Sequence, residues 1–227
     1  MAFMVGGREP AGDGERTAGL LEAGIALASM GVPMLPCHWP VPLRPDTDGW
    51  TRLGCSCGQD DCPRPARHLL DGMEIADATT DVVTVAQWWT GGLCDANVAT
   101  VAGAAFGVVE LRHSARPAQV RAWLAAFEAE PGPVLDAGLG LVQFLTSVGD
   151  RAPRYAPIGQ GTGVRWLGHG ELVALPPSRL TDRYEVSWLQ GLSGVTLPDG
   201  GRLFEVLARL PAAREPAEWT QQRAEVR

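Results

Sequence analysis

Residues 55–68 read Cys55-Ser-Cys57-Gly-Gln-Asp-Asp-Cys62-Pro-Arg-Pro-Ala-Arg-His68 and carry three thiols and one imidazole within a short segment. Zinc takes four such sulfur and nitrogen ligands in a tetrahedron, and ligands that are close in sequence lose little chain entropy on binding. A disulfide between Cys55 and Cys57 would be strained at that spacing. The pattern predicts a structural zinc site, with free buried thiols as the alternative.

Two further donors precede this segment. Cys37 and His38 are adjacent, and either could replace one of the four ligands or stay outside the set. Cys94 has no partner nearby in the sequence, so we expect a lone thiol. Five cysteines, an odd number clustered with histidine, favour a metal site in a reducing compartment over a disulfide framework. We therefore expect a cytoplasmic protein.

The composition is that of a globular protein. A chain of 227 residues with 45% hydrophobic residues can form one sizeable domain. It has neither an apolar run of about 18 residues nor a secretion signal, so we expect no membrane association. The net charge of −7 argues against a protein that binds nucleic acid over its whole surface. Every cation is arginine and lysine is absent, a bias typical of high-GC genomes.

Hydrophobic spacing predicts a helix over Thr17–Met30, a buried strand over Val32–Pro36 and an irregular segment over 38–49. A short helix follows Thr80 or Asp81 as N-cap, with its two tryptophans in packing roles. Two apolar runs on either side of Gly103 predict a central hairpin. The remaining predictions are strands at 97–102, 106–111, 134–135, 141–147, 154–158, 163–167, 171–175 and 184–188, and helices at 117–130 and around 203–210.

This order of elements predicts an α+β fold. We expect residues 1–14 to form a disordered tail, residues 15–210 to form the domain, and residues 211–227 to form a polar tail. The zinc loop, residues 37–70, is inserted into the domain.

Several segments occur in an order that resembles one family. They are Val-Pro-Met-Leu-Pro36, the zinc loop, Asp77-Ala-Thr-Thr-Asp81, Ala96-Asn97-Val98, and Glu171-Leu-Val-Ala-Leu-Pro-Pro-Ser178. Over about residues 18–190 they resemble the primase–polymerase (prim-pol) domain of the archaeo-eukaryotic primase superfamily. The resemblance implies an RRM-like sheet with flanking helices, and chemistry by two Mg²⁺ or Mn²⁺ ions held by acidic residues on neighbouring strands. In relatives the zinc loop commonly ends Gly-Lys-His-Pro, where this chain has Ala-Arg-His68-Leu.

The resemblance also indicates which residues occupy the catalytic positions. The first motif carries two acids one residue apart, so both point to the same face of the strand. This chain keeps Glu110 but has Arg112 at the second position. Gln143 stands where the second motif has a phosphate-contacting histidine. In the third motif Gly163 replaces the acid, while Arg165 remains.

Other candidate residues have simpler interpretations. Asp136 could substitute as a metal ligand, but an aspartate in a turn is commoner. His113 and His169 are expected at the surface. Ser178 has no histidine and aspartate in a triad arrangement, so a serine hydrolase is not supported. Arg112, Arg165, Arg151 and Arg154 could bind a nucleotide or a nucleic-acid backbone, or pair with surface carboxylates.

These substitutions predict a prim-pol-like domain that has lost nucleotidyl transfer. Such a domain would act as an accessory module that binds nucleotide, nucleic acid or a protein partner. One alternative is an active primase/polymerase with relocated metal ligands. Another is a purely structural scaffold held by zinc.

Overall fold

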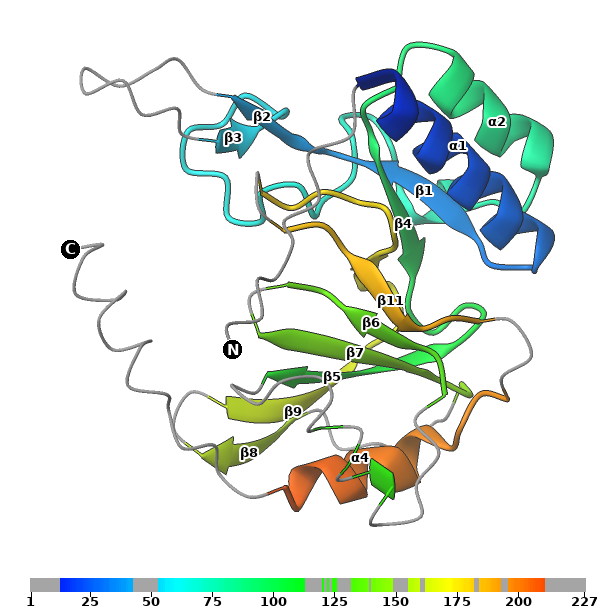
Figure 1. Cartoon of the computed structure of the whole chain (residues 1–227). Coiled ribbons are helices and arrows are strands. Elements are labelled where there is room, and N and C mark those ends of the chain that lie inside the picture. The colour runs from blue at the N-terminus through cyan, green and yellow to red at the C-terminus, as the bar shows by residue number, and fades with distance from the viewer. Residues whose placement is uncertain are drawn as a thin grey trace, which may run out of the picture.

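The computed structural model shows an α+β architecture built on two main antiparallel sheets (Figure 1). It describes residues 13–42, 53–112, 120, 122, 124–125, 132–138, 140–148, 155–159, 162–181, 184–192 and 196–210. Residues 1–12 of the tail predicted at 1–14, the tail at 211–227 and most of the predicted helix at 117–130 lie outside these residues. The tail prediction is wrong for Asp13 and Gly14, which begin helix α1 (Asp13–Ser29). The RRM-like comparison and the predicted domain limits remain predictions.

The smaller sheet has three strands in the order β1-β4-β10 and carries α1 and α2 on one face. Buried Leu20 and Leu27 lie on the inner side of α1, and Gly24 lets α2 approach, since a Cβ there would lie 3.1 Å from Val85. The bounds are α1 Asp13–Ser29, β1 Met34–Cys37, α2 Val82–Thr90, β4 Asn97–Val101 and β10 Leu172–Ala174, with a 3₁₀ turn at Ile75–Asp77.

The local chemistry of α2 follows the prediction. Asp81 is its N-cap, and the carboxylate accepts hydrogen bonds from the amides of Val83 and Thr84. Trp89 is 1% exposed and its indole N–H donates to the carbonyl of Ala96 at 2.8 Å. The packing interpretation is therefore confirmed for Trp89, while Trp88 lies half-buried against the same core.

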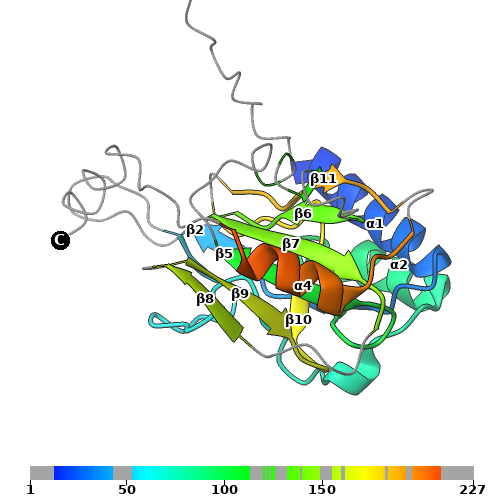
Figure 2. The same cartoon turned by 90° about the horizontal axis from the view of Figure 1, so that it is seen from below.

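The larger sheet has six strands in the order β11-β6-β7-β5-β9-β8, and α4 packs beneath it (Figure 2). Trp166 lies between this sheet and α4, where Gly200 gives it room: a Cβ there would lie 2.3 Å from the indole ring. The bounds are β5 Gly107–Arg112, β6 Val134–Asp136, β7 Leu141–Thr146, β8 Tyr155–Gly159, β9 Thr162–Leu167, β11 Ser187–Gln190 and α4 Gly200–Ala208.

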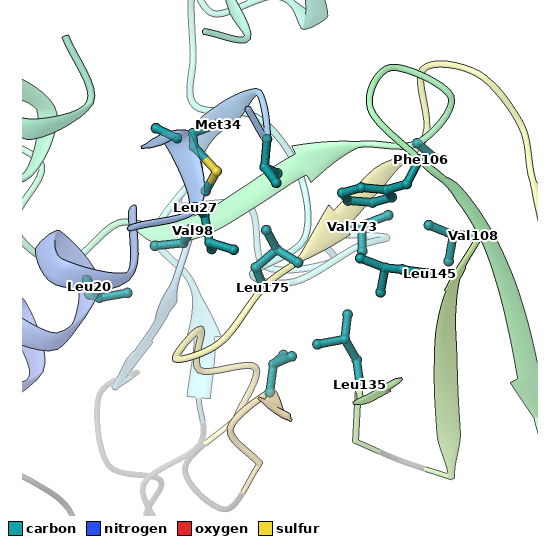
Figure 3. Close-up of a cluster of buried hydrophobic side chains, with 14 of the residues drawn as sticks. Leu20, Leu27, Met34, Val98, Phe106, Val108, Leu135, Leu145, Val173 and Leu175 are labelled. Atoms are coloured by element: carbon teal, nitrogen blue, oxygen red, sulfur yellow. The ribbon is translucent and has the colours of Figure 1, made fainter. Parts of the chain in front are cut away.

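The main hydrophobic core lies between the two sheets (Figure 3). Val98 of β4 and Val173 of β10 meet Val108 of β5 and Leu145 of β7, and all four are fully buried. Alternate residues of β5, Val109 and Leu111, face a second hydrophobic cluster, which lies between the six-stranded sheet and α4. Because β5 is buried on both faces, its sequence is a nearly continuous apolar run.

The predicted hairpin of 97–102 with 106–111 is wrong. The chain does turn at Gly103, whose amide donates to the carbonyl of Phe106. Strand β4, however, pairs with β1 and β10, whereas β5 pairs with β7 and β9. Both edges of each strand are occupied by other partners, so the turn passes the chain from one sheet to the other.

A second correction concerns the segment predicted to be irregular at 38–49. Within it, β2 (Pro40–Pro42) pairs with β3 (Leu53–Cys55) as a separate two-stranded ribbon, and residues 43–52 lie outside the described part. Proline is tolerated in a strand whose N–H is not needed by a neighbour, as at a sheet edge. This ribbon leads directly into Cys55, the first of the predicted ligands.

Candidate functional site

The four predicted zinc ligands converge. The sulfurs of Cys55, Cys57 and Cys62 and a ring nitrogen of His68 all lie within 4.8 Å of one another. His68 Nε2 is 3.3 Å from Cys55 Sγ and 3.4 Å from Cys62 Sγ. A tetrahedral ion with normal zinc bond lengths would place such atoms about 3.5 Å apart. The group could therefore hold a metal with four protein ligands.

Backbone contacts around the cluster suit thiolate ligands. The amide of Ala66 donates to Cys55 Sγ at 3.4 Å. A backbone hydrogen bond from Gln59 lowers the pKa of the Cys57 thiol and so favours its thiolate, whereas burial raises the pKa of the Cys62 thiol and opposes ionisation there. Zinc binds the deprotonated sulfur, and metal binding itself displaces the proton. The donor set and its surroundings fit the metal that the sequence predicts.

Cys37 and His38 lie outside this group. Burial raises the pKa of the Cys37 thiol to about 12, and its sulfur is not among the four ligand atoms that lie within 4.8 Å of one another. The ring of His38 lies against that of His68, with centroids 4.3 Å apart, while its Nδ1 is 2.7 Å from Ser56 Oγ. His38 thus packs against a ligand, and neither alternate belongs to the ligand group. Cys94 is exposed and apart from it, as expected.

Asn97 joins the metal loop to the rest of the molecule. Its fully buried amide donates to the carbonyls of His38, Ala66 and Arg179, and its oxygen accepts from the amide of Arg179. The side chain therefore ties β1, the metal loop and the turn after β10 to the first residue of β4. The hydrogen bonds to His38 and Ala66 are buried, so loss of the Asn97 amide would leave buried carbonyls without a donor.

A pocket of about 420 Å³ lies beside the metal loop, on the face of the six-stranded sheet that carries Glu110. Glu110 of β5 is directly opposite Gln143 of β7 and Arg165 of β9, so all three side chains lie on one face. Gln143 Nε2 donates to Glu110 Oε2 at 2.9 Å. Arg112 follows on the same face, opposite Gly163. The sheet thus places the predicted motif residues together.

The pocket carries more positive than negative charge. Four arginines and two glutamates line it, and both carboxylates are engaged: Glu110 by Gln143, and Glu171 by an ion pair with Arg165. Burial lowers the pKa of Arg67, while nearby Glu110 raises it and Arg112 lowers it. The charged lining residues are Arg64, Arg67, Arg112, Arg165, Glu110 and Glu171, and Gln143 lies beside Glu110.

Asp136 does not supply a missing carboxylate. It pairs with Val142 of β7, whose side chain belongs to the core under α4, so Asp136 lies on the opposite face from Gln143. Its Oδ1 accepts from the amide of Gly138, as expected for an aspartate in a turn. Within the described ranges, the Cys/His group is the only cluster of three or more potential metal ligands.

The other sequence candidates have structural explanations or lie outside the description. The Ser178 hydroxyl accepts from the amide of Val98 and donates to its carbonyl, so it joins the Pro-Pro-Ser turn to β4. His169 is exposed, as expected. His113, Arg151 and Arg154 are among the residues that the structure does not describe.

Three pocket residues were not recognised as such from the sequence. Glu171 was assigned only to the beginning of a strand, and Arg64 and Arg67 only to the metal loop. The loop and the sheet come together only in the folded molecule, where Arg67 Nη2 donates to the carbonyl of Ala137 at 2.9 Å. The sequence does contain a signal for this basic wall: Arg64 and Arg67 lie between two predicted metal ligands in a chain whose net charge is negative.

Comparison with known proteins agrees with the resemblance found in the motifs. The family model of the N-terminal domain of bifunctional DNA primase/polymerase matches residues 24–213. No curated protein matches the chain. In the part that the structure describes, no helix has the length and apolar character needed to cross a membrane. Because the match extends over most of its 227 residues, the chain belongs to the bifunctional DNA primase/polymerase N-terminal (Prim-Pol) family.

Proposed function

We propose that this Prim-Pol domain binds the phosphate group of a nucleotide or nucleic acid in the arginine-lined pocket without catalysing nucleotidyl transfer. We further propose that it acts as an accessory module in nucleic-acid metabolism in the cytoplasm. The observation that supports it is the charge of the pocket: four arginines stand against two carboxylates that are already engaged.

Two-metal catalysis needs several carboxylate oxygens that converge on ions about 4 Å apart. On this sheet, Glu110 accepts a hydrogen bond from Gln143, and Arg112 and Gly163 face each other where two more acids would be expected. A guanidinium next to Glu110 repels a divalent cation and attracts a phosphate. The same positions that would hold Mg²⁺ are therefore suited to an anion.

The Cys3His group would hold zinc, because three sulfurs and one imidazole nitrogen in a closed four-ligand set are typical of structural zinc sites. Zinc in such a site supplies a cross-link and no reaction chemistry. Cys55, Cys57, Cys62 and His68 would bind it and thereby fix the loop that forms one wall of the pocket.

Residual catalysis is the competing function, because Glu110 and Glu171 line the same pocket. The test combines synthesis and binding. Purified protein is given a primed and an unprimed DNA template with labelled nucleotides and Mg²⁺ or Mn²⁺, and binding of thymidine monophosphate is compared with binding of thymidine. We expect no incorporation, and binding only of the phosphate-bearing compound. Incorporation that is abolished in Glu110→Ala would show an active polymerase instead.

A further inference from the structure

Arg67 belongs to both regions of interest: it immediately precedes the metal ligand His68 and it lines the pocket. We propose that Arg67 is an anion-binding residue whose position depends on the metal, so that metal occupancy controls phosphate binding in the pocket. This inference rests on the proposed function, because it requires that the pocket take a phosphate group.

The residues on both sides of Arg67 are fixed through the metal ligands. Ala66 is fully buried with a left-handed φ of 58°; its amide donates to Cys55 Sγ and its carbonyl accepts from Asn97 Nδ2 at 3.2 Å. The carbonyl of His68 accepts from the amide of His38 at 3.0 Å, while the His68 ring lies among the sulfurs. The backbone of Arg67 is thus held between one residue bonded to a ligand and another that is itself a ligand.

The side chain of Arg67 extends from this loop to the sheet. Its Nη2 donates to the carbonyl of Ala137 at 2.9 Å, in the turn between β6 and β7. A guanidinium carries five N–H donors in a planar fork, and the contact with Ala137 uses one of them. The group therefore spans the boundary between loop and sheet while it still has donors suited to phosphate oxygens.

Arg67 and Arg112 form two sides of the pocket with like charge. Both guanidinium groups stay charged at neutral pH, so each disfavours the other electrostatically across the pocket that they line. A phosphate between them would relieve this repulsion and accept hydrogen bonds from both. If the metal is lost, the cross-link that places Arg67 is lost as well, and the pocket keeps only the cations that the sheet supplies.

Calorimetric titration with thymidine monophosphate tests whether Arg67 contributes to anion binding. We expect Arg67→Ala to weaken binding about tenfold, as for the loss of a charge-assisted contact, with metal content and melting temperature close to those of the unsubstituted protein. Arg209→Ala is the matched control, because Arg209 is exposed on the opposite side of the sheet, next to α4, and should leave binding unchanged. Unchanged binding in Arg67→Ala would overturn the inference.

A second titration tests the dependence on the metal in folded protein. Coupling between two sites is reciprocal, so bound thymidine monophosphate should raise the affinity of the Cys3His site for its metal ion. Cobalt is substituted into the site, and its extraction by a chelator is followed in the visible spectrum. We expect the nucleotide to slow extraction several-fold in the unsubstituted protein, and thymidine to have no effect. In Arg67→Ala the nucleotide should no longer slow it.

The outcomes separate the inference from the function on which it rests. If the unsubstituted protein does not bind the nucleotide, the proposed function fails and the inference fails with it. If Arg165→Ala loses nucleotide binding while Arg67→Ala binds the nucleotide as tightly as the unsubstituted protein, the proposed function stands and the inference is wrong. Cobalt extraction that the nucleotide slows equally in both proteins would also overturn the role of Arg67.

Discussion

The metal loop and the sheet pocket are neighbours, but they differ in what their side chains can bind. In the loop, four soft donors converge within 4.8 Å and would satisfy one ion completely. In the pocket, arginines surround a glutamate that already accepts a hydrogen bond from Gln143. The four ligands that a structural cation would need are therefore together, whereas Arg112 and Gly163 stand where the resemblance places catalytic acids. Under the proposed function, a structural metal would support the fold without taking part in catalysis.

Removal of the metal should have the largest effect. Among its described residues, the loop has little regular structure beyond the short β2–β3 ribbon, so we expect Cys55→Ser or chelation to lower the melting temperature by on the order of 10 °C. Circular dichroism with metal analysis measures this. Cys94→Ser is the control, because Cys94 is exposed and outside the ligand group. If chelation leaves the melting temperature unchanged, the loop is held by packing alone.

Replacement of Asn97 tests whether its buried amide holds the metal loop against β4. Asn97→Leu would leave the carbonyls of His38, Ala66 and Arg179 without their donor, and we expect it to lower the free energy of unfolding by about 3 kcal/mol. Urea denaturation measures the change. Gln87→Leu, at an exposed position of α2, should change stability by less than about 0.5 kcal/mol. Equal stability of the two variants would contradict a structural role for the buried amide.

Loss of the sheet cations should weaken anion binding more than it affects stability. We expect Arg112→Ala and Arg165→Ala each to reduce the affinity for thymidine monophosphate about tenfold, since each removes a charge-assisted contact. The salt dependence of binding should fall in both variants. If neither substitution changes the affinity, the ligand binds elsewhere on the domain.

Substitution of Glu171 should have the smallest effect and the opposite sign. Glu171 forms an ion pair with Arg165, so Glu171→Gln would release a cation into the pocket and remove a negative charge. We expect the affinity for thymidine monophosphate to rise about threefold, which corresponds to one partly exposed ion pair. Weaker binding in this variant would suggest that the carboxylate contacts the ligand or holds a metal.

The parts of the site that the sequence predicted are those in which spacing alone determines contact. Cys55, Cys57, Cys62 and His68 lie within one loop, and Glu110 and Arg112 share a face because side chains alternate along a strand. The roles of Arg67 and Glu171 depend on how the loop and β10 meet the sheet, which local pattern does not encode. The predicted hairpin failed for the same reason: periodicity identifies a strand but not its partner.

The most direct test of the central claim is the number of Mn²⁺ ions that the zinc-loaded domain binds, counted by electron paramagnetic resonance with and without a nucleoside triphosphate. We predict no tightly bound Mn²⁺ in the absence of nucleotide, and nucleotide binding that does not require Mn²⁺, because Arg112 and Gly163 stand at positions where metal-binding acids would be needed. Two bound Mn²⁺ ions per chain that are lost in Glu110→Gln would contradict the claim and restore the catalytic interpretation.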